Sequence, residues 1–173
     1  GLTSKAGYAA LAAEADRAGI SGLFGGYVGQ DDRAPDSYIF SMGQNGLGMP
    51  DRDYYLEAAP RFVTIRAAYV QYLTAMLTAA GESNAPARAR AIMSFETTIA
   101  RAHWNKVDSS DATKTCNKMT VAALQRLAPG FDFTTYIHGL GVNSNDIIVG
   151  MPSAFTGIAR AYQQAPLGVL RDQ

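Results

Sequence analysis

Hydrophobic residues recur at three- and four-residue steps along most of this chain, which is the spacing of amphipathic helices. The longest such run begins at Pro60, a residue suited to a first helical turn, and ends near Ala80 before Gly81. A second long run opens at Asn84 and reaches residue 102. Shorter runs predict helices over about residues 4–18, 121–128, 133–140 and from 152 onward. The apolar positions of the first long run are Phe62, Ile65, Tyr69, Leu73, Met76 and Ala80.

The period changes between residues 23 and 42. Two short aromatic-rich stretches, 23–28 and 37–42, flank the polar segment 30–36, and Tyr38, Phe40 and Met42 alternate with other residues. We predict a small β-hairpin over about residues 23–42. Residues 147–149 are a candidate single strand, and 107–111 read as a loop. The predicted fold class is therefore mainly α, a multi-helix domain with a small hairpin, in one unit over residues 1–173.

The composition is typical of a folded chain and disfavours some classes of binding partner. Apolar residues make up 47% and charged residues 17% of the 173 residues, and fifteen Lys plus Arg balance fifteen Asp plus Glu. A net charge of zero removes the electrostatic basis for nucleic acid or an anionic membrane surface. No apolar run reaches the ~18 residues needed to span a bilayer. Cys116 is the only cysteine, so no internal disulfide can form.

Residues 46–56 (GLGMPDRDYYL) form the most specific stretch. The glycines permit unusual backbone angles, Pro50 stops a preceding strand, and Asp51 or Asp53 can cap a starting helix, so physics predicts a loop-to-helix junction. The string also resembles the Leu-Gly-Leu-Pro-x-Arg-Asp-Tyr-Tyr signature of the neprilysin-like zinc metallopeptidases. In that family the signature lies in the non-catalytic helical part.

The resemblance extends along nearly the whole chain in the family's order. Similar stretches are 19–30, 95–100, 114–120, 128–133, 149–153 and 165–167. Two departures fall in one loop region: Cys116 stands where the family usually has Tyr, and Ser110-Asp111 stands where Arg-Asp is common.

The resemblance implies a zinc held by the two His of an H-E-x-x-H motif and a distant Glu, with the motif Glu as general base. This chain has only His103 and His138, and neither stands beside a Glu. We therefore assign no catalytic, cofactor-binding or metal residue within 1–173. The zinc ligands are expected further along a longer polypeptide.

The resemblance further implies that this piece is scaffold and cavity wall, inactive alone, in a zinc metalloendopeptidase that restricts its substrates by size. Its expected partners are the zinc domain of the same polypeptide and peptide substrates, with no nucleic acid. The expected location is extracytoplasmic, periplasmic or secreted from a bacterium. Residues 167–173 have helical spacing without a terminator. We therefore expect an interrupted domain whose isolated form exposes apolar surface and self-associates.

Two functions of other classes stay open: a stand-alone helical peptide- or protein-binding module, and an unrelated small enzyme built around His103 or His138. Glu96 and His103, seven residues apart on one helix, could be a metal pair, although a hydrogen-bonding Glu and a helix-end His are favoured.

Further candidate groups have simpler explanations. Asp31-Asp32 and residues 143–146 offer calcium ligands but lack the Gly and distal Glu of an EF-hand loop. The glycines of 22–29 lack a phosphate-loop ending, and Cys116 lacks a visible base. Arg52 and Asp53 are explained by capping and an ion pair. The stripe at 69, 72, 73 and 76 favours core packing over a binding groove.

Overall fold

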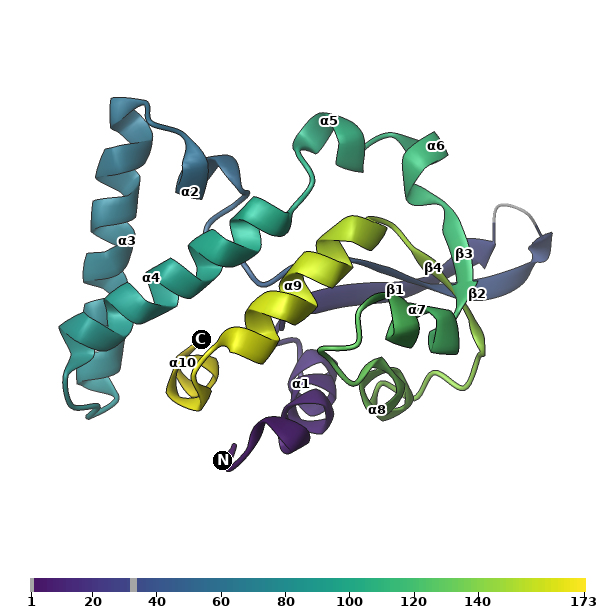
Figure 1. Cartoon of the computed structure of the whole chain (residues 1–173), viewed down its shortest axis with the longest axis horizontal. Coiled ribbons are helices and arrows are strands. Elements are labelled where there is room, and N and C mark those ends of the chain that lie inside the picture. Colours follow the sequence, from purple (N-terminus) through teal and green to yellow (C-terminus); the bar gives the residue numbers. More distant parts are fainter. Residues whose placement is uncertain (1, 32–33) are drawn as a thin grey trace.

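The computed structural model describes residues 2–31 and 34–173 and confirms a mainly α-helical chain with a small β part. Helices cover a sheet, and an arm of two long helices lies beside it (Figure 1). A short 3-10 turn, Lys5–Gly7, precedes α1. The helices are α1 Tyr8–Arg17, α2 Asp53–Leu56, α3 Pro60–Ala79, α4 Ala85–Ala102, α5 Lys106–Ser109, α6 Ala112–Thr115, α7 Val121–Leu127, α8 Phe133–Gly139, α9 Pro152–Gln164 and α10 Leu167–Asp172. The strands are β1 Phe24–Asp31, β2 Ala34–Gln44, β3 Asn117–Thr120 and β4 Asp146–Val149.

The predicted hairpin is present, with β1 and β2 antiparallel from Phe24↔Gln44 to Gln30↔Tyr38. The sheet continues beyond it: the described residues form four strands in the order β1-β2-β4-β3. β4, expected as a single strand, lies parallel to β2 and antiparallel to β3. The sequence did not reveal β3, because Asn117–Thr120 (NKMT) lacks the run of β-branched apolar residues that marks 147–149.

The prediction of a loop at 107–111 is wrong in part. α5 covers residues 107–109 as a single turn, residues 110 and 111 lie outside the helices, and α6 forms a second single turn directly after them. The side chain of Asn105 accepts a hydrogen bond from the Asp108 amide, and Asp111 accepts one from the Thr113 amide, both at 2.9 Å. Such caps stabilise turns too short to show a helical period.

Side chains also cap two longer helices, α7 and α8. The Thr120 hydroxyl accepts from the Ala123 amide at 3.1 Å, which starts α7, and the Asp132 carboxylate accepts from the Thr135 amide at 2.9 Å, which starts α8. Each cap satisfies an amide that has no partner within its own helix.

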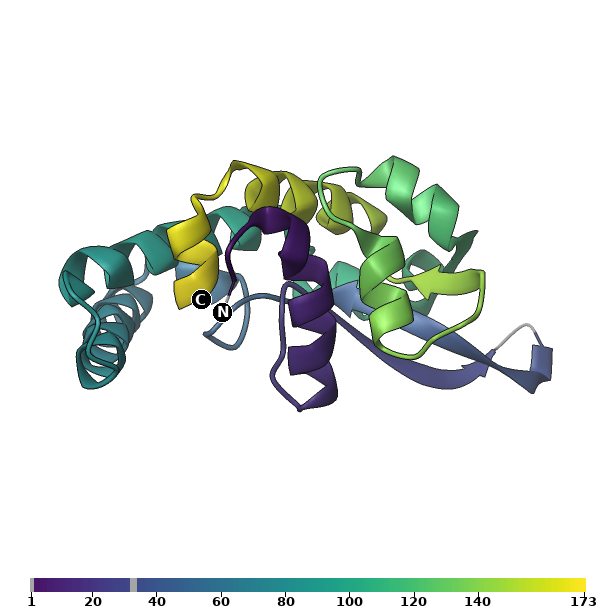
Figure 2. The ribbon, with the colours of Figure 1, turned by 90° about the horizontal axis from the view of Figure 1, so that it is seen from below.

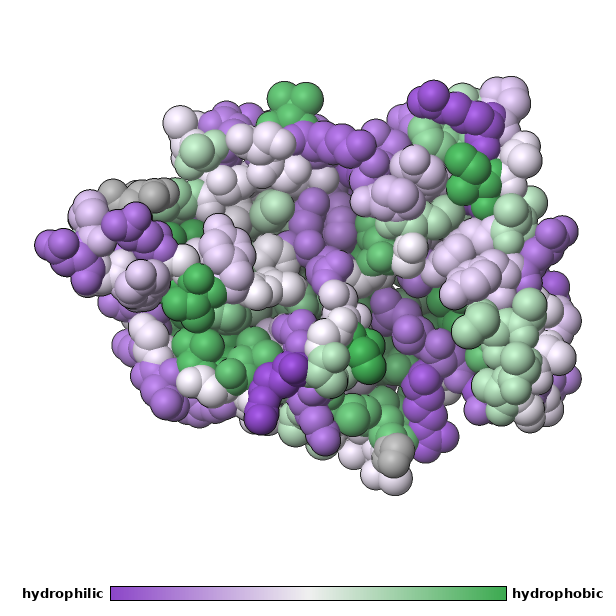
Figure 3. All heavy atoms as spheres, turned by 180° about the vertical axis from the view of Figure 1, so that it is seen from behind, coloured by the Kyte–Doolittle hydropathy of each residue, from purple (hydrophilic) through white to green (hydrophobic). Residues whose placement is uncertain are grey.

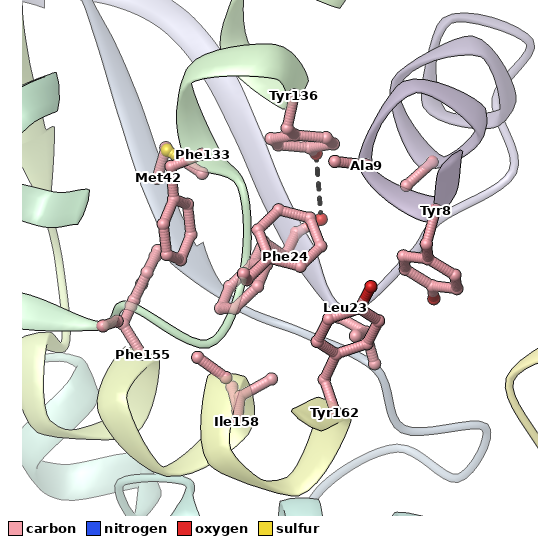
Figure 4. Close-up of a cluster of buried hydrophobic side chains, with 14 of the residues drawn as sticks. Tyr8, Ala9, Leu23, Phe24, Met42, Phe133, Tyr136, Phe155, Ile158 and Tyr162 are labelled. Atoms are coloured by element: carbon pink, nitrogen blue, oxygen red, sulfur yellow. Dashed lines mark hydrogen bonds between the residues drawn. The ribbon is translucent and has the colours of Figure 1, made fainter. Parts of the chain in front are cut away.

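The core lies between the sheet and the helices α1, α7, α8 and α9. Phe24 of β1 stacks on Phe155 of α9, with ring centroids 4.8 Å apart. Tyr136 closes this cluster, and its hydroxyl donates to the Phe24 carbonyl at 3.2 Å (Figure 4). The same hydroxyl also donates to an Asp16 carboxylate oxygen on α1 at 2.7 Å, the shorter of its two bonds. Phe155 and Tyr136 thus connect α9, near the C-terminal end, and α1, near the N-terminal end, to strand β1.

α4 joins the two parts of the molecule, because it packs on α3 along one side and on α9 along the other. Gly157 permits the second contact: a Cβ there would lie 2.4 Å from the Cβ of Ala102. Seen from below, the arm and the hairpin extend at opposite ends, and the two termini lie near each other (Figure 2). No helix in the described ranges is both long and apolar enough to cross a bilayer.

The expectation that the stripe on α3 is core packing is wrong for half of its members. Tyr69 and Leu73 are half-buried, but Tyr72 is 58% and Met76 is 54% exposed. α4 covers only one side of α3, so apolar residues next to that side remain at the surface.

Candidate functional site: the signature loop and its buried carboxylate

The signature begins directly after β2 and brings the chain to α2. Gly46 has φ of +93°, and a Cβ there would lie 3.2 Å from the Leu23 Cα. Gly48 faces α3: a Cβ there would lie 1.9 Å from the Tyr69 hydroxyl and 3.3 Å from a Glu96 oxygen. Glycine is required at both positions, at the first for its backbone angle and at the second for close approach.

The carboxylate of Glu96 is the centre of this region. It lies on α4, and the residue is only 3% exposed. The Tyr55 hydroxyl of α2 donates to its Oε2 at 2.7 Å, and the Tyr69 hydroxyl of α3 donates to its Oε1 at 3.1 Å. The Gly48 amide also donates to it. One buried carboxylate thus connects α2, α3, α4 and the loop.

Tyr55 has a second bond that holds the loop. The Met49 amide donates to the Tyr55 hydroxyl at 2.9 Å while that hydroxyl donates to Glu96. A buried hydroxyl that both accepts and donates is fully used, so the loop conformation depends on this pair.

Burial shifts the titration of the whole cluster. Desolvation raises the pKa of Glu96, and the hydrogen bonds from Tyr55, Tyr69 and Gly48 act in the opposite direction. Burial, followed by the Glu96 charge, raises the pKa of Tyr55 and of Tyr69 far above the usual range. Both tyrosines therefore remain neutral donors, which is the state the carboxylate requires.

A second polar group fixes the other side of the loop. The His103 ring Nε2 lies 3.0 Å from the Asn45 carbonyl oxygen, and Arg52 donates to the His103 carbonyl at 2.9 Å. Burial lowers the pKa of His103, and the nearby Arg52 charge lowers it further. Lys106 pairs with the Asp51 carboxylate at 2.7 Å.

The signature also caps its own helix. The Asp51 carboxylate accepts from the Asp53 amide at 2.8 Å, which confirms the predicted loop-to-helix junction. Arg52 bonds across to His103 instead of forming the expected pair with Asp53.

These residues do not fit a zinc site. Over residues 2–31 and 34–173, no three His, Cys, Asp or Glu side chains are grouped so that they could hold a metal ion. Glu96 is bonded to tyrosines, His103 faces a carbonyl, and His138 is exposed on α8.

The remaining candidates lie apart from the signature loop. Asp31 is paired with Lys118 at 2.7 Å, and Asp32 lies outside the described residues. In the turn at 143–146, the Ser144 hydroxyl donates to the Asp146 carbonyl at 2.8 Å. The glycines of 22–29 fall within or just before β1, as expected.

Cys116 lines a groove of about 590 Å³ beside the sheet. Its lining also includes Tyr27 and Gly29 of β1, Ser41 of β2 and Met151. Its mixed lining contains no charged side chain, so the groove can accept peptide backbone or small side chains without ionic selection.

The sequence points to Glu96 but not to its tyrosine partners. Tyr55 lies in the signature, and the spacing of Tyr69 predicts a place in a packing stripe. The only available signal was that a buried helical Glu needs hydrogen-bond donors. No spacing rule links residues 55, 69 and 96, because three different helices carry them.

Fold and site together define a mainly helical module in which hydrogen bonds within the signature and to α3 and α4 fix the signature loop. The family model described as Peptidase family M13, for the N-terminal part of its members, matches residues 1–172. The chain belongs to this family, the neprilysin-like zinc metallopeptidases, which confirms the resemblance of its signature.

Relatives agree with this assignment. An endothelin-converting enzyme homolog from Locusta migratoria is 32% identical over 116 residues, which are 66% of this chain and 16% of that protein. The zinc metalloprotease Zmp1 of Mycobacterium tuberculosis in its open state matches with a TM-score of 0.90 and 27% identity, over 99% of this chain and 27% of that one. The inhibitor complex of the same enzyme gives 0.88 and 29%, over 99% and 26%. The chain thus spans only a minor part of each relative's length.

Proposed function

We propose that residues 1–173 are part of the non-catalytic helical half of a zinc metalloendopeptidase, forming scaffold and cavity wall. The observation that supports this most directly is the match of 99% of the chain to an open-state zinc metalloprotease of which it covers 27%. The whole enzyme would hydrolyse peptide bonds with a zinc held by residues outside 1–173.

The packing of the helical arm, α3 and α4, is suited to the wall of a substrate cavity. α3 and α4 pack on each other, and the Glu96 cluster fixes α2 and the signature loop against both of them. A buried and fully bonded cluster resists bending, which a wall that excludes large substrates requires. Size exclusion by this wall would favour peptides over folded proteins.

The test uses the whole enzyme with zinc bound. A series of peptides of increasing length is compared with a stable folded protein containing the same cleavable sequence. We expect kcat/KM to fall with increasing length, the folded protein to stay intact, and chelation to abolish cleavage until zinc is restored.

The two halves of the proposal fail separately. Equal cleavage of the folded protein and the short peptides would refute the wall role, and cleavage unaffected by chelation would refute the zinc enzyme. The chain 1–173 alone is the matched control, and we expect it to cleave none of the peptides. An extracytoplasmic location is part of the proposal; activity confined to the cytoplasmic fraction of the source cells would contradict it.

A further inference from the structure

α3 carries a second apolar stripe beside the one that α4 covers. Phe62 and Leu77 are buried, and Val70 and Leu73 pack towards α4. The second stripe consists of exposed residues at steps of three and four. These are Ile65, Ala68, Tyr72, Ala75 and Ala79, with Met76 beside them.

The spacing of this stripe is that of a helix-packing seam. Residues 65, 72 and 79 are seven apart, as are 68 and 75, which is the a/d pattern of a heptad repeat. Alanines at 68, 75 and 79 would let another helix approach closely. An exposed seam with this pattern is unusual on a helix that needs only one neighbour.

Charge is also missing from this part of α3. No charged side chain occurs between Arg66 and Glu82, although most of the intervening surface faces away from α4. In the view from behind, pale green, mildly hydrophobic atoms gather at the right edge, where α3 lies (Figure 3). An uncharged surface favours an uncharged partner, because a charged side chain of the partner would lose its hydration there without gaining an ion pair.

The end of the chain is held next to this arm. Asp172 of α10 receives two bonds from Arg88 of α4, at 2.7 and 2.5 Å, and its side chain is 6% exposed. The Gln173 side chain donates to the Gly46 carbonyl at 3.0 Å. Asp172 and Gln173 also line one pocket with Tyr69 and Leu73, so a segment that followed would start beside α3 and α4.

We propose that this second stripe is the packing surface for an apolar helix from the part of the same polypeptide outside residues 1–173. The inference rests on the proposed function, in which this chain is a minor part of a longer enzyme. It identifies the surface of α3 through which residues 1–173 contact the remainder of that enzyme. A single stripe of six residues falls well short of the ~800 Å² per partner that a stable dimer buries. A covalently connected helix needs no such area, because its effective concentration is high.

The test compares two adjacent alanines in the whole enzyme, in a Cys116→Ser background. Consecutive helical positions differ by about 100°, so Ala68 lies on the seam and Ala67 lies off it, although both are exposed in this chain. We expect the Ala68→Cys thiol to react with a maleimide at least about tenfold more slowly than the Ala67→Cys thiol, as expected for a covered site. Labelled sites are identified by peptide mass spectrometry.

Equal labelling rates in the monomeric enzyme would overturn the inference. Protection found only in a dimer fraction, separated by size-exclusion chromatography and identified by light scattering, would also overturn it. Radical footprinting of the unmodified enzyme needs no substitution. Tyr72 and Met76 should oxidise far more slowly than Tyr38, which is 81% exposed in this chain, and comparable oxidation would also overturn the inference. Peptidase activity is measured separately, so an exposed seam in an active enzyme would leave the proposed function intact.

Discussion

Gly48 offers the sharpest test of the signature loop, through the substitution Gly48→Ala. The added Cβ would lie 1.9 Å from the Tyr69 hydroxyl and 2.8 Å from its Cζ, and shifts of a few tenths of an ångström cannot relieve this. The Tyr69 ring must swing outward, which breaks its 3.1 Å bond to Glu96. We therefore expect the hydrogen bond, not the backbone, to decide the cost.

The expected change in the free energy of unfolding is the balance of two opposing effects. A hydrogen bond to a charged group contributes about 1.5–3 kcal/mol. Replacing Gly by Ala where the backbone allows it stabilises by about 0.4–1 kcal/mol through the unfolded chain. The net expectation is a loss of about 1–2 kcal/mol in the free energy of unfolding, measured by urea denaturation.

A double-mutant cycle isolates the cause. In a Tyr69→Phe background the hydroxyl is absent, so Gly48→Ala should cost about 1 kcal/mol less than in the original chain. Gly168→Ala is the matched control, because a Cβ on α10 there meets nothing within 4 Å, and it should be neutral or stabilising. A Gly48→Ala cost that is unchanged by Tyr69→Phe would refute the reasoning.

Two further predictions concern charge and capping. The pKa of Glu96 is raised on folding, so its stabilising contribution is complete below its ordinary value of 4.5 and is lost as pH rises through the folded value. The unfolding free energy of the original chain, relative to Glu96→Gln, should therefore fall from pH 4 towards pH 8, and parallel pH profiles would count against a raised pKa. Thr120→Ala removes the N-cap of α7 and should cost about 1 kcal/mol in thermal or urea unfolding. Thr78→Ala, on an exposed helical position, should cost little, and equal losses would show that the cap is not the cause.

The sequence by itself determined the local features of this protein. The helices at 60–79 and 85–102, the caps at Thr120 and Asp132 and the junction at Asp51 follow from residues close in the chain. Propensity, capping and periodicity act over one or two turns, and a single sequence displays them directly. The signature at 46–56 likewise needed only adjacent residues to indicate the family.

Tertiary structure alone decided how distant segments meet. Four-residue strands become a sheet only when β4 lies between β2 and β3, and Glu96 gains its donors only where three helices converge. It also decided which side of α3 is covered, since α3 offers two apolar stripes and α4 covers just one of them. Local interactions determine a residue's backbone conformation and the side of the helix or strand on which it lies. Its tertiary contacts depend on segments that are far apart in the chain, and no regular spacing in the sequence marks which segments meet.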